Sequence, residues 1–315
     1  MMPRSSRRVL LATSSFGAID STPVERIQAA GFVPVPNPYA RRLTRDEVVS
    51  LLTDDVVGLI AGLEPLDRNV LEGSSLEAIC RVGSGMSNVD LAAASELGIV
   101  VDSTPDGPTN AVAELTLGAL LALLREIPAM DRALHEGRWD KRIGEQIDGK
   151  TALVVGYGRI GRRVGQLLNA FGAEVLAVDP QVDQSQVEVP LVSLEAGLER
   201  AHIVCVHASG ESCLLGAREL ALLPDGAYIL NPGRGGLVSE QALHEFLVHG
   251  RLAGAWLDVF DDEPYEGPLR DLSNVLLTAH VGSYTAECRV RMETQAVDLL
   301  LEALGGATAS PGSIQ

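Results

Sequence analysis

A short apolar segment followed by three spaced glycines constrains this chain more than any other feature. Residues 151–155, Thr-Ala-Leu-Val-Val, form an apolar, β-branched run typical of a strand buried on both faces of a parallel sheet. Gly156, Gly158 and Gly161 follow it, and apolar residues then recur at helical spacing as far as Phe171. The pattern predicts a strand, a tight turn at Gly156 and a helix that Gly161 allows to pack closely on the strand.

This arrangement is typical of a site for the pyrophosphate of a dinucleotide. Gly158 has no Cβ, so a phosphate can approach the backbone, and the new helix offers free N–H groups at its positive end. A second predicted strand, 174–179, ends at Asp179, about 20 residues beyond the glycines. We expect Asp179 to bind the adenosine ribose and to repel a 2′-phosphate, which favours NAD over NADP. A glycine turn that binds nothing is the alternative interpretation.

Composition and charge exclude several classes of function. The chain has 315 residues, 46% of them hydrophobic, which is enough for two domains. Its net charge of −17 argues against a nucleic-acid partner, because phosphate backbones are bound by excess Lys and Arg. No apolar run approaches the ~20 residues of a membrane span, and the basic N-terminus precedes no signal-peptide core. The 4 cysteines form no CxxC pair, which predicts reduced thiols and no metal site. We therefore predict a cytoplasmic protein.

Strand and helix patterns alternate through the first hundred residues. Strands are predicted at 8–14, 32–36, 57–61, 78–82 and 99–102. Regular alternation with short loops predicts a doubly wound parallel sheet. The segment Phe32–Pro36 contains prolines and is expected at an edge of this sheet. Thr44 is expected to cap the helix that follows it.

The alternation stops at residues 109–136, which form one long helical pattern with an almost wholly apolar middle. Such a helix must be buried, either between two domains or in a subunit interface, and Pro128 is expected to kink it. A second sheet begins at Thr151. Its further strands are predicted at 202–208, 227–231, 253–259 and 275–279. A last helix is predicted over 286–304.

Four loops that follow predicted strands carry unusual chemistry. They contain the segment Gly83–Gly85, an arginine between glycines (Arg234), a carboxylate in an acidic segment (Glu263) and a histidine (His280). Ligands of open α/β sheets bind beyond the carboxyl ends of the strands. An arginine can bind a carboxylate as a fork, and a histidine oriented by a carboxylate can exchange a proton. Beside a nicotinamide, these groups suit hydride transfer between a 2-hydroxy acid and a 2-keto acid, although each alone is more often a solvated or capping side chain.

With these residues in place, the chain resembles the D-isomer-specific 2-hydroxyacid dehydrogenases, and among them the D-3-phosphoglycerate dehydrogenase-like group. The similarity covers about residues 57–301. It rests on the motifs at Arg81–Asp90, Asn110–Glu114, Gly156, Asn231–Val238, Asp258–Pro264 and His280–Thr285. It implies two doubly wound parallel-sheet domains, with a Rossmann cofactor domain at 104–285 inserted into a flavodoxin-like substrate domain at 1–103 and 286–315.

The resemblance also implies a role for each matching residue. Arg234 would bind the substrate carboxylate, His280 would be the acid/base, and Glu263 would pair with His280. The cofactor would be NAD, held by residues of the glycine turn and of the strand ends: Gly156, Gly158, Arg159, Ile160, Gly161, Asp179, His207 and Asp258. The backbone N–H groups of Ser84 and Gly85 would help to seat the carboxylate. The long helix would belong to the cofactor domain and to the interface of a homodimer.

Departures from the family pattern concern the substrate and the adenine side of the cofactor. His207-Ala-Ser replaces the usual His-x-Pro, and Met86-Ser87 alters a wall near the substrate. Phosphoglycerate enzymes commonly hold phosphate with basic residues in the loop that corresponds to 62–65, whereas here no cation follows before Arg68. Lys141 and Arg142 are the alternative cationic candidates.

Three functions are therefore compared. The first is an NAD-dependent dehydrogenase of a D-2-hydroxy acid. The second is an enzyme for a phosphorylated or phosphonate hydroxy acid, including 3-phosphoglycerate, or for formate or phosphite, which lack the α-hydroxyl group and need a remodelled pocket. The third is an NADH-sensing regulator without turnover. All three catalytic positions are occupied and no basic patch is present, which favours the first.

Overall fold

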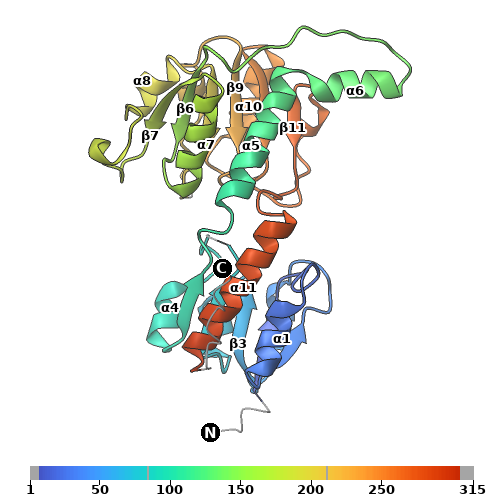
Figure 1. The fold of residues 1–315 in the computed structure, drawn as a ribbon, viewed down its shortest axis with the longest axis vertical. Helices are drawn as coiled ribbons and strands as arrows, with labels where there is room; N and C mark the ends of the chain where they lie inside the picture. The colour runs from blue at the N-terminus through green and yellow to red at the C-terminus, as the bar shows by residue number, and fades with distance from the viewer. Residues whose placement is uncertain (1–6, 84, 211, 306–315) are drawn as a thin grey trace, which may run out of the picture. The chain divides into compact units, whose positions relative to one another are not determined.

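The computed structural model describes residues 7–83, 85–210 and 212–305, which form two compact units. The first unit runs to Pro108 and resumes at Ser283, while the second consists of Thr109–Gly282. Each unit contains one parallel sheet with helices on both of its faces (Figure 1). The predicted fold class, two α/β domains built on parallel sheets, is confirmed.

The first unit has a 5-stranded sheet in the order β2-β1-β3-β4-β5. Its strands are β1 (Arg8–Leu11), β2 (Val33–Pro36), β3 (Val56–Ala61), β4 (Ala78–Arg81) and β5 (Val100–Ser103). Its helices are α1 (Thr22–Ala29), α2 (Arg45–Leu51), α3 (Arg68–Glu72), α4 (Leu91–Glu96) and α11 (Ala286–Ala303). Five parallel strands in the order 2-1-3-4-5 define a flavodoxin-like sheet.

The two faces of this sheet pack against different helices. Leu10, Leu59 and Ile79 belong to the core that α2, α3 and α4 cover. On the opposite face, Gly58 leaves room for α11, because a Cβ at this position would lie 3.3 Å from the side chain of Leu300. Figure 1 shows α11 in this unit beside β3, and α11 also contacts α1. The last helix of the chain therefore completes the core that the first hundred residues begin.

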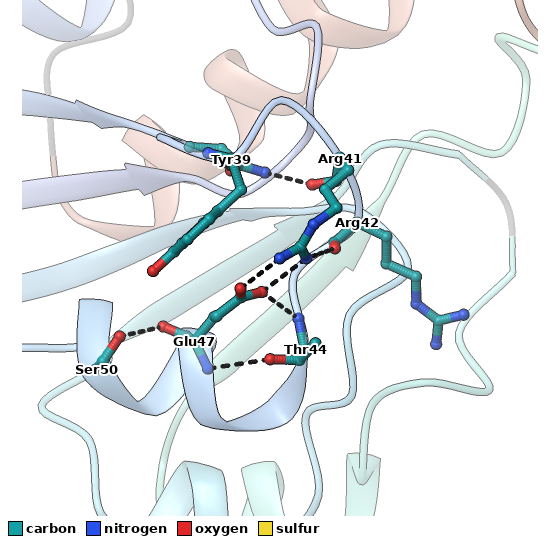
Figure 2. Close-up of polar contacts among 7 residues, drawn as sticks. Tyr39, Arg41, Arg42, Thr44, Glu47 and Ser50 are labelled. Atoms are coloured by element: carbon teal, nitrogen blue, oxygen red, sulfur yellow. Dashed lines mark hydrogen bonds and ion pairs between the residues drawn. The ribbon is translucent and has the colours of Figure 1, made fainter.

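The predicted edge strand and the predicted helix cap are both confirmed. β2 lies at the edge of the sheet, so its prolines, which have no N–H, remove no hydrogen bond between strands. Thr44 Oγ1 accepts the N–H of Glu47 at 3.4 Å, and Glu47 Oε2 accepts the N–H of Thr44 at 2.8 Å. Figure 2 shows this capping box and the fork that Arg41 forms on Glu47, at 2.9 and 2.6 Å. The Arg41 hydrogen bonds lower the pKa of Glu47 to about 2, so the cap stays ionised.

The second unit has a 6-stranded sheet in the order β11-β10-β9-β8-β6-β7. Its strands are β6 (Thr151–Val155), β7 (Glu174–Val178), β8 (Ile203–Val206), β9 (Ala227–Asn231), β10 (Leu252–Leu257) and β11 (Val275–Leu277). Its helices are α5 (Thr109–Leu124), α6 (Ile127–His135), α7 (Arg159–Ala170), α8 (Leu194–Leu198), α9 (Ala217–Leu220) and α10 (Glu240–Val248), with 3₁₀ turns at Gln184–Gln186 and Pro268–Asp271. A parallel bridge between Ala177 and Leu191 extends the sheet beyond β7. This bridge stands where the third strand of the Rossmann order 3-2-1-4-5-6 belongs.

Two separate cores hold the faces of the second sheet. Val154 and Trp256 lie in the core that α5 and α7 cover, and both are fully or almost fully buried. Leu153 and Leu257 point to the other face, which α8, α9 and α10 cover. The strands are apolar on both sides because a parallel sheet with helices on each face exposes neither side to water.

The expected single kinked helix at 109–136 is wrong. Two helices occupy this stretch. The helical conformation is interrupted between Leu124 and Ile127, where Glu126 adopts a left-handed backbone with φ of 48°. Pro128 lies in the first turn of α6, where a missing N–H costs no hydrogen bond, so it starts a helix instead of bending one.

No helix in the described ranges is long and apolar enough to cross a membrane.

Side-chain caps mark where two further helices begin. α4 begins at Leu91, because the Asp90 carboxylate accepts the N–H of Ala93 at 2.8 Å and caps the helix there. Ser239 caps α10 by accepting the N–H of Ala242. Side-chain caps therefore decide these boundaries.

Candidate active site

The three candidate catalytic residues follow three neighbouring strands of the second sheet. Arg234 follows β9, Glu263 follows β10 and His280 follows β11, and these strands lie side by side. Backbone hydrogen bonds continue past the strand ends: Asp258 N–H donates to Asn231 at 3.1 Å, and His280 N–H donates to Asp258 at 2.8 Å. Because parallel strands share one carboxyl edge, the three loops start from the same edge of this unit.

His280 and Glu263 form the pair that the sequence predicts. The imidazole Nδ1 lies 3.1 and 3.0 Å from the two carboxylate oxygens, and the two side chains are 36% and 30% exposed. The N–H of Phe260 donates to Glu263 Oε1 at 3.2 Å, which orients the carboxylate. A carboxylate at Nδ1 favours the tautomer with hydrogen on Nδ1, so Nε2 is the ring nitrogen available for proton exchange.

The side chain of Asn231 holds the backbone of the loop that carries Arg234. The Asn231 side chain donates to the carbonyl of Arg234 at 2.9 Å and accepts the N–H of Gly233 at 3.1 Å. At Gly235 a Cβ would lie 1.9 Å from the carbonyl oxygen of Phe260, so only glycine fits between this loop and the next. The guanidinium bonds the carbonyl of Gly233 at 2.7 Å through Nη1. The glycines and Asn231 therefore fix the position of the arginine backbone.

Asp258 is almost completely buried, and its carboxylate holds the loop of His280. Oδ1 accepts from the Thr278 hydroxyl at 2.5 Å and from the N–H of Val281 at 2.9 Å, while Oδ2 accepts from the N–H of Gly282 at 2.8 Å. A carboxylate offers about four acceptor positions, so Oδ2 keeps one for a further donor. A role for Asp258 in holding the cofactor thus stays a prediction.

The glycine turn has the close packing that the sequence predicts. Gly156 has φ of +90°, and a Cβ there would lie 2.3 Å from the backbone nitrogen of Ala208. At Gly161 a Cβ would meet the carbonyl oxygen of Gly156 at 2.0 Å, so this glycine brings the helix onto the turn. A Cβ at Gly158 would meet nothing within 4 Å. The open space above Gly158 is where a pyrophosphate could lie.

The N-terminus of α7 and the end of β7 meet at this turn. Gly158 is the N-cap residue of α7, so Arg159 and Ile160 lie in its first turn, at the positive end of the helix dipole. The Asp179 carboxylate accepts the N–H of Tyr157 at 2.8 Å and that of Gln181 at 2.9 Å. Asp179 therefore lies beside the glycine turn, held by two backbone donors, with acceptor capacity left for a ribose.

His207 lies where β8 ends, beside the strand that leads into the glycine turn. Its N–H donates to Val155 at 2.7 Å. Burial lowers the pKa of the imidazole to about 3, so the ring is neutral, and its Nε2 is buried without a hydrogen-bond partner among the described residues. A buried polar atom without a partner at this position fits a bound dinucleotide, as does the open space at Gly158.

Besides Arg234, the predicted substrate-binding residues are Ser84 and Gly85, in the part of the sequence that belongs to the first unit. Ser84 lies outside the described residues, and Gly85 follows β4 in the part that is described. The loop after β3 contains Glu64, which is 1% exposed, and burial raises the pKa of its carboxyl, although the Gly62 N–H and the charges of Arg81 and Arg42 act in the opposite direction. Cations from other elements therefore act on this loop, although the loop sequence contains none.

Two residues near His280 had not been identified from the sequence. Trp256 Nε1 donates to the Thr278 hydroxyl at 3.0 Å, and that hydroxyl bonds Asp258. In sequence, Trp256 is one more apolar residue of a buried strand and Thr278 one more residue at a strand end. Only the pairing of β10 with β11 brings the indole and the hydroxyl together. In the described residues no group of three or more His, Cys, Asp or Glu side chains is placed to hold a metal ion.

Comparisons with known proteins find similar sequences and structures over most of this chain. Residues 117–282 match the family described as D-isomer specific 2-hydroxyacid dehydrogenase, NAD binding domain. A hydroxypyruvate reductase of Thermotoga maritima is 32% identical over 84% of this chain and 90% of that protein. A D-3-phosphoglycerate dehydrogenase of Methanocaldococcus jannaschii is 35% identical over 86% of this chain, but the match spans only 54% of that longer protein. The crystal structure of a glyoxylate reductase from Paecilomyes thermophila superposes with a TM-score of 0.86 at 27% identity, covering 98% of each chain.

Proposed function

Because this chain belongs to the D-isomer-specific 2-hydroxyacid dehydrogenase family, we propose that it interconverts a D-2-hydroxy acid and its 2-keto acid with NAD as cofactor. The observation that supports this most directly is the His280–Glu263 pair on the same sheet edge as Arg234, within the unit that matches the NAD-binding domain. The relatives are named as dehydrogenases and reductases, which gives no support to a regulator without turnover.

In this proposal the three side chains have different tasks. Arg234 binds the substrate carboxylate as a fork, and its charge also polarises the neighbouring carbonyl. In oxidation, His280 Nε2 takes the proton of the substrate hydroxyl group; in reduction it returns that proton to the carbonyl oxygen. Glu263 lies beside Nδ1 and stabilises the imidazolium that forms. A bound nicotinamide would supply the hydride chemistry, as acceptor from C2 in oxidation and as donor in reduction.

The cofactor contacts follow from the same unit. We propose that the N–H groups of Arg159 and Ile160 bind the pyrophosphate above Gly158, and that Asp179 binds the adenosine ribose. Gly156 and Gly161 give the turn the close packing that brings its backbone to the pyrophosphate. The buried imidazole of His207 and the carboxylate of Asp258 complete the cofactor side of the site.

Removal of the Asp179 charge tests the expected preference for NAD. In Asp179→Asn a side-chain oxygen still accepts the N–H of Tyr157, but a 2′-phosphate no longer meets a negative charge. We expect NADH to bind about 10-fold more weakly, because a hydrogen bond to a charged group is lost, and the discrimination against NADPH to shrink. Titrations followed by Trp fluorescence measure both constants, with the melting temperature as a control for folding. A wild-type chain that binds NADPH more tightly than NADH would contradict the role of Asp179.

The similar proteins are named for acids with different side chains. A hydroxypyruvate reductase, phosphoglycerate dehydrogenases and a glyoxylate reductase are all similar to this chain. A D-3-phosphoglycerate dehydrogenase is 35% identical to this chain, so a phosphorylated acid is among the candidates. We expect the purified chain to oxidise NADH with at least one acid of a panel containing glyoxylate, hydroxypyruvate and 3-phosphohydroxypyruvate. Loss of NADH absorbance is the measurement, and bound NADH without turnover of any acid would contradict the proposal.

We propose a homodimer formed through the cofactor unit. The supporting observation is a set of exposed apolar side chains on α6 and in the loop after it: Ile127, Leu134, Trp139 and Ile143. Trp139 is 78% and Ile143 98% exposed in the single chain, and large apolar groups in such a cluster mark interaction surfaces. Light scattering of the intact chain should give twice the chain mass.

We also propose that the enzyme is cytoplasmic, which its free cysteines favour.

A further inference from the structure

His280 has an unusual backbone conformation for a histidine. Its φ is 52°, in the left-handed region that side chains other than glycine rarely adopt. Such a conformation persists only when surrounding contacts hold it in place. The position of the imidazole depends on this backbone, so the contacts that hold it also set the direction of Nε2.

Asp258 supplies the contacts on both sides of His280. Its carbonyl oxygen accepts the N–H of His280 at 2.8 Å. Its carboxylate accepts the N–H groups of the next two residues, Val281 at 2.9 Å and Gly282 at 2.8 Å. One aspartate thus binds three consecutive backbone N–H groups, and a rotation of its carboxylate would release two of them.

Thr278 and Trp256 fix the carboxylate in turn. The indole N–H of Trp256 can only donate, so the Thr278 oxygen, 3.0 Å away, must accept from it. The single hydroxyl hydrogen of Thr278 is then directed to Asp258 Oδ1 at 2.5 Å. Trp256 is 0% and Asp258 1% exposed, so water does not compete for these bonds.

We propose that Trp256 and Thr278 are positioning residues for His280. The indole N–H sets the direction of the Thr278 hydroxyl, the hydroxyl fixes the Asp258 carboxylate, and the carboxylate holds the left-handed backbone at His280. With that backbone in place, Nδ1 faces Glu263 and Nε2 faces the substrate. This inference rests on the proposed function, in which His280 exchanges the proton.

Two variants of Thr278, one isosteric and one that keeps the hydroxyl, separate positioning from packing. Thr278→Val keeps the shape of the side chain and removes only the hydroxyl, whereas Thr278→Ser keeps the hydroxyl and removes only a methyl group. We expect kcat of Thr278→Val to fall about 10–100-fold, because small displacements of a catalytic group have effects of this size. The KM of the keto acid and the Kd of NADH should change less than 3-fold. Thr278→Ser should keep kcat within about 3-fold of the wild type, and Trp256→Phe, which loses only the indole N–H and some volume, should fall between the two.

A merely structural role gives the reverse pattern. If Thr278 only packs, the loss of a methyl group in Thr278→Ser damages the protein at least as much as Thr278→Val, and kcat follows the melting temperature in both variants. A Thr278→Val protein that stays folded with wild-type kcat overturns the proposal while the proposed function stands.

Amide hydrogen exchange at Val281 and Gly282 provides a measurement that needs no turnover. We expect these two amides to lose protection in Thr278→Val and to keep it in Thr278→Ser. Unchanged protection in Thr278→Val overturns the proposal. If the wild type binds NADH but reduces no acid, the proposed function fails, and the exchange comparison alone decides whether Thr278 holds this loop.

Discussion

We expect the His280→Ala protein to reduce its 2-keto acid about 10²–10⁴-fold more slowly than the wild-type chain, with NADH affinity unchanged. The imidazole is the group on this sheet edge whose Nδ1 is bound by a carboxylate, at 3.0 Å, while Nε2 is left for the substrate. Without it, the proton must come from water. Steady-state loss of NADH absorbance gives kcat, and fluorescence titration gives the Kd of NADH.

A second histidine provides the control for this experiment. His249, at the C-terminal end of α10, bonds the backbone of its own helix and follows no strand end. His249→Ala should therefore keep its turnover within about 2-fold of the wild type, an ordinary outcome for a surface substitution. Equal activity of His280→Ala and His249→Ala would remove His280 from the mechanism.

We expect Arg234→Met to lower kcat/KM for the keto acid by about 10²–10³-fold, because a charge that pairs with the substrate carboxylate is lost. Arg234→Lys keeps the charge but loses the planar fork, so it should recover only part of this loss. The backbone of residue 234 is held by Asn231 in either variant, since these bonds involve no atom of the Arg234 side chain. The loss should therefore come from the guanidinium and not from a displaced loop.

Arg251→Met is the matched control. Arg251 pairs with Asp225 at 2.6 Å, and both side chains are largely exposed, so this ion pair contributes little to stability. We expect its kcat/KM to stay within about 2-fold of the wild type. Initial rates over a range of keto-acid concentrations separate kcat from KM. If Arg234→Met and Arg251→Met have the same kcat/KM, Arg234 does not bind the substrate.

Local patterns were sufficient to predict most elements of the fold. Alternating strand and helix signals placed the strands of both sheets, and the prolines of β2 correctly marked an edge. The glycines at 156, 158 and 161 predicted a turn whose tight contacts the structure contains. These features depend on interactions between residues close in sequence, or on backbone geometry that only glycine allows, so they are visible without the fold.

The prediction of a single helix at 109–136 was wrong because it relied on apolar periodicity. Apolar periodicity continues across the break between α5 and α6, whereas the left-handed residue Glu126 interrupts the backbone. Periodicity records which side chains are buried and does not record the backbone angles of one exposed residue. Pro128 was a true signal of the break, but its position in a first helical turn could not be distinguished from a kink.

The sequence by itself determined which chemical groups this protein has at its strand ends: a guanidinium between glycines, an acidic loop and a histidine. Only the tertiary structure decided how they are held. The order β9, β10, β11 places the three loops on one edge, and strand pairing brings Trp256 to Thr278 and Thr278 to Asp258. The physical reason is that hydrogen bonds between side chains depend on three-dimensional register, which joins residues about 20 positions apart and leaves no periodic trace along the chain.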